Sequence, residues 1–202
     1  MDNNTFPDKV CRCSWLDTSK TDYVNYHDEE WGVPVYDDQT LFEYLCLESA
    51  QAGLSWYTIL KRRDGYRNAF NNFNIDIVAK YDQNKVEELV RNTDIIRHRG
   101  KITAAINNAQ RFIDIKKEFV SFSVYLWQFV NNKTIINSWS DPSGCPTSTN
   151  ESDALCKDLR KRGFKFVGPT ICYAYMQACG VVNDHDISCY KRSQIINKYQ
   201  QS

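Results

Sequence analysis

Two cysteines and two histidines at opposite ends of the chain have the residue types and spacing of a metal site. Cys13 and His27 lie near the N-terminus, and His185 and Cys189 lie near the C-terminus. Because His185 and Cys189 are four residues apart, one helical turn would place both side chains on the same face. Two Cys and two His form a complete tetrahedral set for Zn²⁺ and leave no position for water or substrate. The sequence therefore predicts a structural zinc that joins the two chain ends, with the chemistry located elsewhere.

The same four residues have a plainer interpretation. The chain contains 8 Cys, so a Cys close to a His arises by chance. Either His can also be an ordinary buried residue whose ring nitrogens are satisfied by hydrogen bonds.

Aromatic residues gather around an acidic stretch in the first third of the chain, and Glu48 stands among them. Flat aromatic faces beside carboxylates suit a planar, electron-poor or cationic ligand. Glu48 follows Leu41 and Leu45 at helical spacing, so its carboxylate falls on the apolar stripe of a predicted helix. A carboxylate buried there is costly unless a ligand or partner meets it, which makes Glu48 a candidate functional residue. The alternative is a Glu at a helix end that reaches solvent.

A short basic turn joins two predicted helices within residues 84–116. It contains Arg97 and Arg99 and ends in Gly100, at the start of the second helix. Free backbone N–H groups and the positive end of a helix dipole suit a phosphate, and the basic side chains add to this attraction. These are the requirements of a helix-hairpin-helix element, with Asp94 at a position that often holds glycine and requires left-handed backbone. An ordinary αα-hairpin with a charged turn is the alternative.

Helical periodicity dominates the rest of the chain, and no segment alternates as a half-buried strand does. The sequence predicts an all-α protein of about eight to ten helices. Residues 131–150, rich in Asn, Ser, Thr and Pro, are predicted to form a long loop. Helices are expected at 38–53, capped by Asp37 or Asp38, and at 55–70, capped by Ser55. Further helices are expected at 84–92, 102–115, 124–130, 155–162 and 171–179.

Composition indicates a globular protein of one domain, with 42% hydrophobic and 25% charged residues over 202 positions. Lys plus Arg equals Asp plus Glu at 25 each, but the basic residues cluster, at 61–63, 97–101 and 157–165. Such clusters permit a polyanion partner at a local surface, with solvated helix faces as the alternative. No stretch spans a bilayer, the first residues do not read as a signal peptide, and the cysteines suit a reducing interior. We therefore expect a cytoplasmic protein.

Five segments, in order along nearly the whole chain, resemble the family of 3-methyladenine DNA glycosylase I. They are 26–34 (YHDEEWGVP), 47–56 (LESAQAGLSW), 95–102 (IIRHRGKI), 162–168 (RGFKFVG) and 179–185 (CGVVNDH). The resemblance implies a helix-hairpin-helix DNA glycosylase fold in one unit over 1–202, with the hairpin at about 84–116. It also implies zinc-bound terminal segments at about 11–36 and 180–195. It maps the zinc ligands onto Cys13, His27, His185 and Cys189, with Cys13 preferred over Cys11 because Cys13 precedes Trp15 at the family's Cys-x-Trp spacing.

The activity that the resemblance implies is bacterial DNA repair, in which 3-methyladenine is flipped out of alkylated double-stranded DNA and released by hydrolysis of its N-glycosidic bond. Neither a catalytic Asp after the hairpin nor a lyase Lys stands at a matching place, so we expect a monofunctional enzyme without lyase activity. Nothing in the sequence suggests an oligomer, so we expect a monomer. Glu48 is the candidate catalytic residue, with base binding, oxocarbenium stabilisation and water activation as its alternative roles. The implied base contacts are Tyr26, Trp31, Glu48, Trp56, Trp15 and Tyr23, and the implied DNA contacts are Gly53, Leu54, Arg97, Arg99, Gly100 and Lys101.

Two other functions compete with this interpretation. A zinc-stabilised helix-hairpin-helix module that binds DNA without catalysis would keep the hairpin and the metal ligands, but gives no reason for Glu48 among aromatic residues. A redox or metal enzyme that uses the Cys and His groups directly conflicts with a closed site of four ligands.

Overall fold

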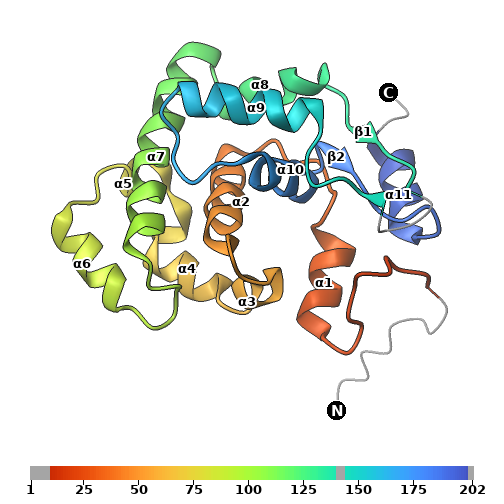
Figure 1. The fold of residues 1–202 in the computed structure, drawn as a ribbon, viewed down its shortest axis with the longest axis horizontal. Coiled ribbons are helices and arrows are strands. Elements are labelled where there is room, and N and C mark those ends of the chain that lie inside the picture. Colours follow the sequence, from red (N-terminus) through yellow and green to blue (C-terminus); the bar gives the residue numbers. More distant parts are fainter. Residues whose placement is uncertain (1–9, 140–143, 200–202) are drawn as a thin grey trace.

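A computed structural model describes residues 10–139 and 144–199, and this part of the chain is mostly helical (Figure 1). No helix in these ranges is long and apolar enough to cross a membrane. The elements are α1 Thr21–Glu29, α2 Asp38–Gln51, α3 Trp56–Leu60, α4 Arg63–Ala69, η1 Asn71–Phe73, α5 Ile75–Val78, α6 Gln83–Arg91, α7 Arg99–Phe119, α8 Phe122–Trp127, η2 Gln128–Val130, β1 Ile135–Ile136, α9 Asn150–Lys161, α10 Pro169–Ala178, β2 Val182–Asn183 and α11 Tyr190–Tyr199.

Helix α2 lies at the centre of the molecule, beside α10 (Figure 1). Helices α4 to α7 lie on one side of it, and α1, α11 and the two short strands lie on the other. Every residue of α2 from 41 to 50 is buried. A helix that is buried on all sides belongs to the core. Glu48 is buried because the whole helix is central. The sequence predicted one apolar stripe on this helix, whereas α2 is buried on all its faces.

The predicted helix over 55–70 is wrong, because the chain forms two helices there, α3 and α4. Ser55 caps the first as expected, accepting a hydrogen bond from the backbone N–H of Thr58 at 3.3 Å. The break at Arg62 has a tertiary cause. Its guanidinium donates to the carbonyl of Thr93 at 2.7 Å, while Arg63 turns inward to bind Glu43.

The region 131–150 was predicted to be a loop, but it contains a strand. Strand β1 pairs in parallel with β2, with Ile135 opposite Val182 and Ile136 opposite Asn183. Ile135 and Ile136 are too short a run to show the alternation of a strand in the sequence. They form a strand only because the distant residues Val182 and Asn183 lie beside them. Residues 140–143 of this region lie outside the described part. The helix count also exceeds the expected eight to ten, since the described residues form eleven α-helices.

Helices α6 and α7 form the expected hairpin, joined by residues 92–98. Asp94 does not adopt left-handed backbone there, so that expectation is wrong. Its N–H donates to Asn92 Oδ1 at 2.8 Å, which closes the turn without positive φ. The hairpin turn packs closely against α4 at Gly65. A Cβ on Gly65 would lie 2.6 Å from the carbonyl oxygen of Asp94, so only a glycine fits there.

Candidate functional site

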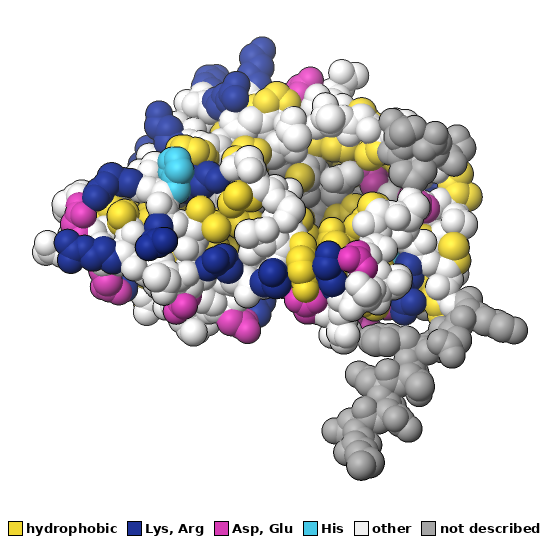
Figure 2. Space-filling model, turned by 60° about the horizontal axis from the view of Figure 1, so that its bottom comes forward, with side chains coloured by type: hydrophobic (Ala, Val, Ile, Leu, Met, Phe, Trp, Pro, Cys, Tyr) yellow, Lys and Arg dark blue, Asp and Glu magenta, His cyan; other side chains and the backbone are white. Residues whose placement is uncertain are grey.

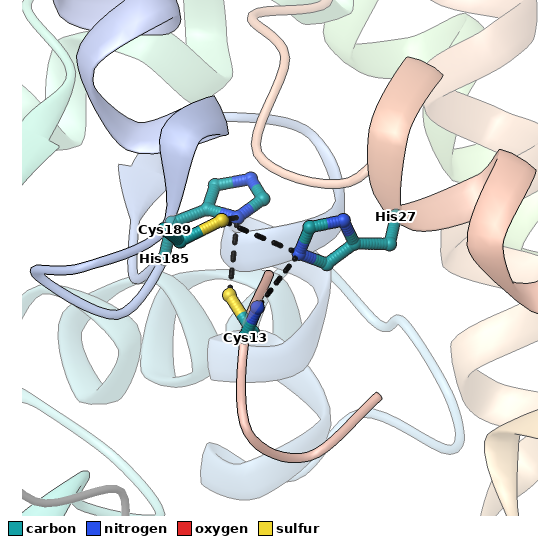
Figure 3. Close-up of side chains that lie close together, drawn as sticks. All are labelled: Cys13, His27, His185 and Cys189. Atoms are coloured by element: carbon teal, nitrogen blue, oxygen red, sulfur yellow. Dashed lines mark hydrogen bonds between the residues drawn. The ribbon is translucent and has the colours of Figure 1, made fainter. Parts of the chain in front are cut away.

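The structure brings the four predicted metal ligands together in one buried cluster (Figure 3). Cys13 precedes α1, His27 lies in its last turn, and His185 and Cys189 lie between β2 and α11. Their ligand atoms all lie within 4.8 Å of one another. The segment from His185 to Cys189 is a turn closed by a 2.8 Å bond from Cys189 N to Asp186 O, and not the helical turn that the spacing predicted.

The geometry of the cluster fits a tetrahedral metal. Cys13 Sγ lies 3.2 Å from His185 Nδ1, and Cys189 Sγ lies 3.5 Å from His185 Nδ1 and 3.6 Å from His27 Nε2. Tetrahedral Zn²⁺, with bonds of about 2.3 Å to sulfur and about 2.0 Å to nitrogen, holds a sulfur and a nitrogen ligand about 3.5 Å apart. A hydrogen bond from the Cys13 thiol also keeps the pKa of Cys189 far below its usual range. A thiolate, the form that binds metal, is thus favoured.

Both histidines are oriented through the ring nitrogen that faces away from the thiols. His27 Nδ1 lies 2.8 Å from Asp28 Oδ1, and Asp28 is in turn held by Arg12 at 2.8 Å. His185 Nε2 lies 2.9 Å from the carbonyl oxygen of Trp31. Carboxylate and carbonyl partners of this kind fix the tautomer of a metal-ligating imidazole. Cys11 is exposed and outside the cluster, so the structure places Cys13, and not Cys11, beside the two histidines and Cys189.

A cavity of about 250 Å³ lies beside the cluster, bounded mainly by α1, α2, α3 and α10. A cavity of about 150 Å³ is enough for benzene, so this one has room for a two-ring heterocycle. All six residues predicted to bind the base line it, namely Trp15, Tyr23, Tyr26, Trp31, Glu48 and Trp56. They come from the N-terminal segment, α1 and its end, α2 and α3.

Glu48 is the carboxylate in this cavity that is available to a ligand. It is only 5% exposed, and it makes no hydrogen bond or ion pair with any other residue that the structure describes. Burial alone raises the pKa of its carboxyl group to about 8, because desolvation penalises the charged form. A buried carboxyl without a partner marks a ligand site.

The cavity has two other carboxylates, Asp184 and Asp186, which are already engaged. Asp184 accepts hydrogen bonds from Gln177 at 2.7 Å, from Tyr173 at 2.5 Å, and also from Asn137 and Trp139. Asp186 accepts one from the backbone N–H of Ser14 at 2.7 Å. Both carboxylates thus accept hydrogen bonds from the protein, whereas Glu48 accepts none from the described residues.

The cluster of two Cys and two His also supports the aromatic wall of the cavity. Trp31 packs edge to face on His185, with ring centroids 4.6 Å apart, and Trp15 packs on His27 at 5.4 Å. Trp15 and Trp31 pack on each other at 4.9 Å. Loss of the cluster would release two walls of the cavity together, so its structural role extends to the site.

Tyr26 and Trp56 form a second aromatic pair in the cavity, with ring centroids 5.2 Å apart. The indole N–H of Trp56 is buried and has no acceptor among residues 10–139 and 144–199. A buried donor without an acceptor costs free energy that a ligand acceptor can recover.

The loop after α2 carries an exposed apolar side chain next to the cavity. Gly53 has φ +81, and a Cβ placed there would meet nothing within 4 Å. Leu54, which follows it, is 40% exposed. A groove lined by both residues also touches Glu48 and Gln51, so it adjoins the cavity. Leu54 thus projects from the surface at the edge of the pocket.

The hairpin lies on the same face of the molecule as this loop. Figure 2 shows Lys and Arg side chains spread over the side where α6 and α7 lie, beside a recess that exposes hydrophobic side chains. Arg97 is exposed and forms no ion pair among the described residues, whereas Arg99 binds Glu87 at 2.6 Å. Lys101 faces inward, and its ammonium group donates to the carbonyls of Ala50 and Ala52.

The sequence also matches a known family over most of its length. The family model described as methyladenine glycosylase matches residues 15–192. The chain belongs to the methyladenine glycosylase family. Among curated members, it is similar to DNA-3-methyladenine glycosylase 1 of Escherichia coli (strain K12), with 50% identity over 178 residues, which cover 88% of this chain and 95% of that protein.

Solved structures of family members share the fold. A crystal structure of 3-methyladenine DNA glycosylase I superimposes with a TM-score of 0.86 and 49% identity, covering 89% of this chain and 98% of the other. A Tyr-to-Phe variant of such an enzyme, solved in complex with 3-methyladenine, gives a TM-score of 0.84 and 37% identity, covering 87% and 94%.

Several residues of the cavity in this family member were missed by the sequence reasoning. Gln51 stands three residues after Glu48 on α2, a spacing that could have indicated it. The others come from segments far along the chain, and only the fold brings them to the cavity: Trp139, Cys145, Ala174, Gln177, Asp184 and Asp186.

Proposed function

We propose that the chain is a DNA repair glycosylase that flips 3-methyladenine out of alkylated DNA and hydrolyses its N-glycosidic bond, leaving an abasic site. The observation that carries this proposal is Glu48, a buried carboxyl without a protein partner, in an aromatic cavity of about 250 Å³. Two relatives that are 50% and 46% identical and are named DNA-3-methyladenine glycosylase support it.

The cavity selects the base by charge and shape. Methylation at N3 leaves the base in DNA cationic, so it is already a good leaving group and needs little protonation. Stacking on Tyr26 and Trp56 suits a flat cation, and the cation favours the ionised form of Glu48. Neutral adenine lacks this charge and meets a carboxyl group that stays protonated near neutral pH, since its pKa is about 8.

Extraction of the base from the duplex requires a DNA-binding surface beside the cavity. We assign it to the hairpin, with Arg97, Arg99 and Gly100 directed at the phosphates. The exposed Leu54, next to Gly53, fills the gap that the flipped base leaves. A single chain without an obligate partner suffices for all of these steps.

The proposed enzyme does not cleave the DNA strand. A lyase needs an amine to attack the sugar, and no lysine lines the cavity within the described residues. The hairpin Lys101 is bound to two backbone carbonyls. The metal cluster, for which we propose Zn²⁺ held by Cys13, His27, His185 and Cys189, has no open position for substrate and serves the structure.

The deciding experiment is incubation of the protein with methylated double-stranded DNA, followed by chromatography of the released bases. Release of 3-methyladenine by the wild type, with alkali-labile sites but no direct strand breaks on a denaturing gel, is the expected result. Duplex binding without base release would instead identify the zinc-stabilised DNA-binding module. Direct strand breaks would identify a lyase.

A further inference from the structure

Lys101 occupies a position that links the hairpin to the end of the central helix. Its Nζ donates hydrogen bonds to the carbonyl oxygens of Ala50 at 2.8 Å and Ala52 at 2.6 Å. Helix α2 ends at Gln51 and is followed by Ala52 at its C-cap. Carbonyls at the end of a helix lack partners within the helix and carry its negative dipole end, so an ammonium group is well placed there.

The same residue belongs to the first turn of the hairpin's second helix. Its backbone N–H donates to Nδ1 of His98, which caps α7, at 3.2 Å. One side chain therefore connects the N-terminal end of α7 directly to the start of the loop that carries Gly53 and Leu54.

The far end of that loop is attached to the hairpin as well. Ser55 begins α3, and α3 continues into α4 after a short break. From this break Arg62 donates to the carbonyl of Thr93 in the hairpin turn at 2.7 Å. Gly65 of α4 then packs against the backbone of Asp94 without room for a Cβ. Between these two attachments, Leu54 is the one large hydrophobic side chain that is exposed, at 40%.

We propose that Lys101 is a positioning residue, which fixes the loop of residues 52–55 against the hairpin so that DNA binding at the hairpin drives Leu54 into the duplex. The inference rests on the proposed function, and it replaces the expectation that Lys101 contacts a phosphate. Without the ammonium group the loop keeps its sequence but loses its fixed position when the hairpin binds.

Two substitutions at this position and one matched control test the proposal. Lys101→Met keeps most of the apolar stem and removes both hydrogen bonds, whereas Lys101→Arg keeps donors and charge. Lys117→Met removes an exposed lysine from the far end of the same helix, where its ammonium lies 3.7 Å from Asp114. Loss of two charge-assisted hydrogen bonds predicts that Lys101→Met excises 3-methyladenine from duplex DNA about tenfold to a hundredfold more slowly. Lys101→Arg should recover part of this loss, and Lys117→Met should behave as the wild type.

The salt dependence of duplex binding separates positioning from phosphate contact. A lost phosphate contact lowers the slope of log affinity against log salt concentration by about one. For Lys101→Met we expect the wild-type slope and the wild-type affinity for free 3-methyladenine. A slope reduced by about one, with excision restored at low salt, would overturn the proposal in favour of phosphate contact.

Two further measurements test the coupling itself. Amide hydrogen exchange at residues 52–55 should be faster in Lys101→Met than in the wild type, with the rest of α7 unchanged. If the positioning acts through Leu54, Lys101→Met should slow excision little further in a Leu54→Ala background, whereas fully additive effects would contradict it. The exchange experiment needs no activity, so unchanged exchange refutes the inference and leaves the proposed function standing. A wild type that releases no base refutes the proposed function itself.

Discussion

Replacement of Glu48 by Gln is expected to stabilise the folded protein, and to do so more strongly as the pH rises. The carboxyl group is buried, and its pKa is about 8 in the folded state against 4.5 for an ordinary Glu. Between these values the folded state keeps a proton that the unfolded chain has released. The pH-dependent stability of the wild type is therefore full below pH 4.5 and is lost as the pH rises toward 8.

The size of the effect follows from the two pKa values. Relative to a residue that does not ionise, Glu48 costs the folded state about 2 kcal/mol at pH 6, about 3 kcal/mol at pH 7 and about 5 kcal/mol at pH 9. Gln has nearly the shape and polarity of the protonated carboxyl, so the substitution removes this cost and adds little of its own. For a protein of this size, 1 kcal/mol corresponds to about 2–4 °C in Tm.

Urea denaturation of wild type and Glu48→Gln at pH 6, 7, 8 and 9, with the same metal content in every sample, measures the difference. Glu29→Gln is the matched control, because Glu29 lies exposed on α1 and its substitution should leave the pH profile unchanged. A wild type that is more stable than Glu48→Gln at pH 9 would refute the reasoning, since it would mean that the folded state stabilises the ionised carboxylate. A gain of constant size at every pH would refute it too.

Three further predictions concern metal, DNA and base. Metal analysis should find one zinc per chain. Cys189→Ser should lose the zinc and unfold at a lower urea concentration, because metal binding contributes to folding. Well-folded wild type without zinc would contradict this prediction. Reversing charge at Arg97 and Arg99 should weaken binding to undamaged duplex and flatten its salt dependence, and unchanged binding at every salt concentration would exclude the hairpin as the anchor. In calorimetric titrations with adenine as the control ligand, Glu48→Gln should bind 3-methyladenine more weakly than the wild type by about 1.5–3 kcal/mol. Trp56→Ala should also weaken the binding of 3-methyladenine, because it removes a stacking wall of the cavity. Unchanged discrimination between the two bases would leave selection to the aromatic walls.

Local signals in the sequence were sufficient for the helical fold and for much of the candidate site. The caps at Asp37 and Ser55 are confirmed, since each side chain accepts from the backbone N–H three residues on. The hairpin of α6 and α7 is also confirmed as a pair of helices with a short turn. These features are decided within a few residues, because capping and helical periodicity depend on neighbours along the chain.

Features that depend on distant contacts were decided only by the tertiary structure. The break at Arg62 exists because the side chain of Arg62 binds Thr93 while that of Arg63 turns inward to Glu43, and the strand at Ile135 exists because Val182 lies beside it. Asp184 enters the cavity wall only through the fold. In each case the stabilising contact joins segments at least twenty residues apart, which no local pattern can encode.

The site shows the same division between sequence and structure. The residue types alone determined that two Cys and two His can hold a zinc, and that Glu48 stands among aromatic residues. The fold decided that Cys13, and not Cys11, reaches the cluster, and that Glu48 is buried without a partner. The fold also brings the ammonium group of Lys101 to the end of α2, where it donates hydrogen bonds to carbonyl oxygens that lack partners within the helix. Sequence fixes which groups a chain can offer, whereas their burial and partners follow from packing among segments that only folding brings together.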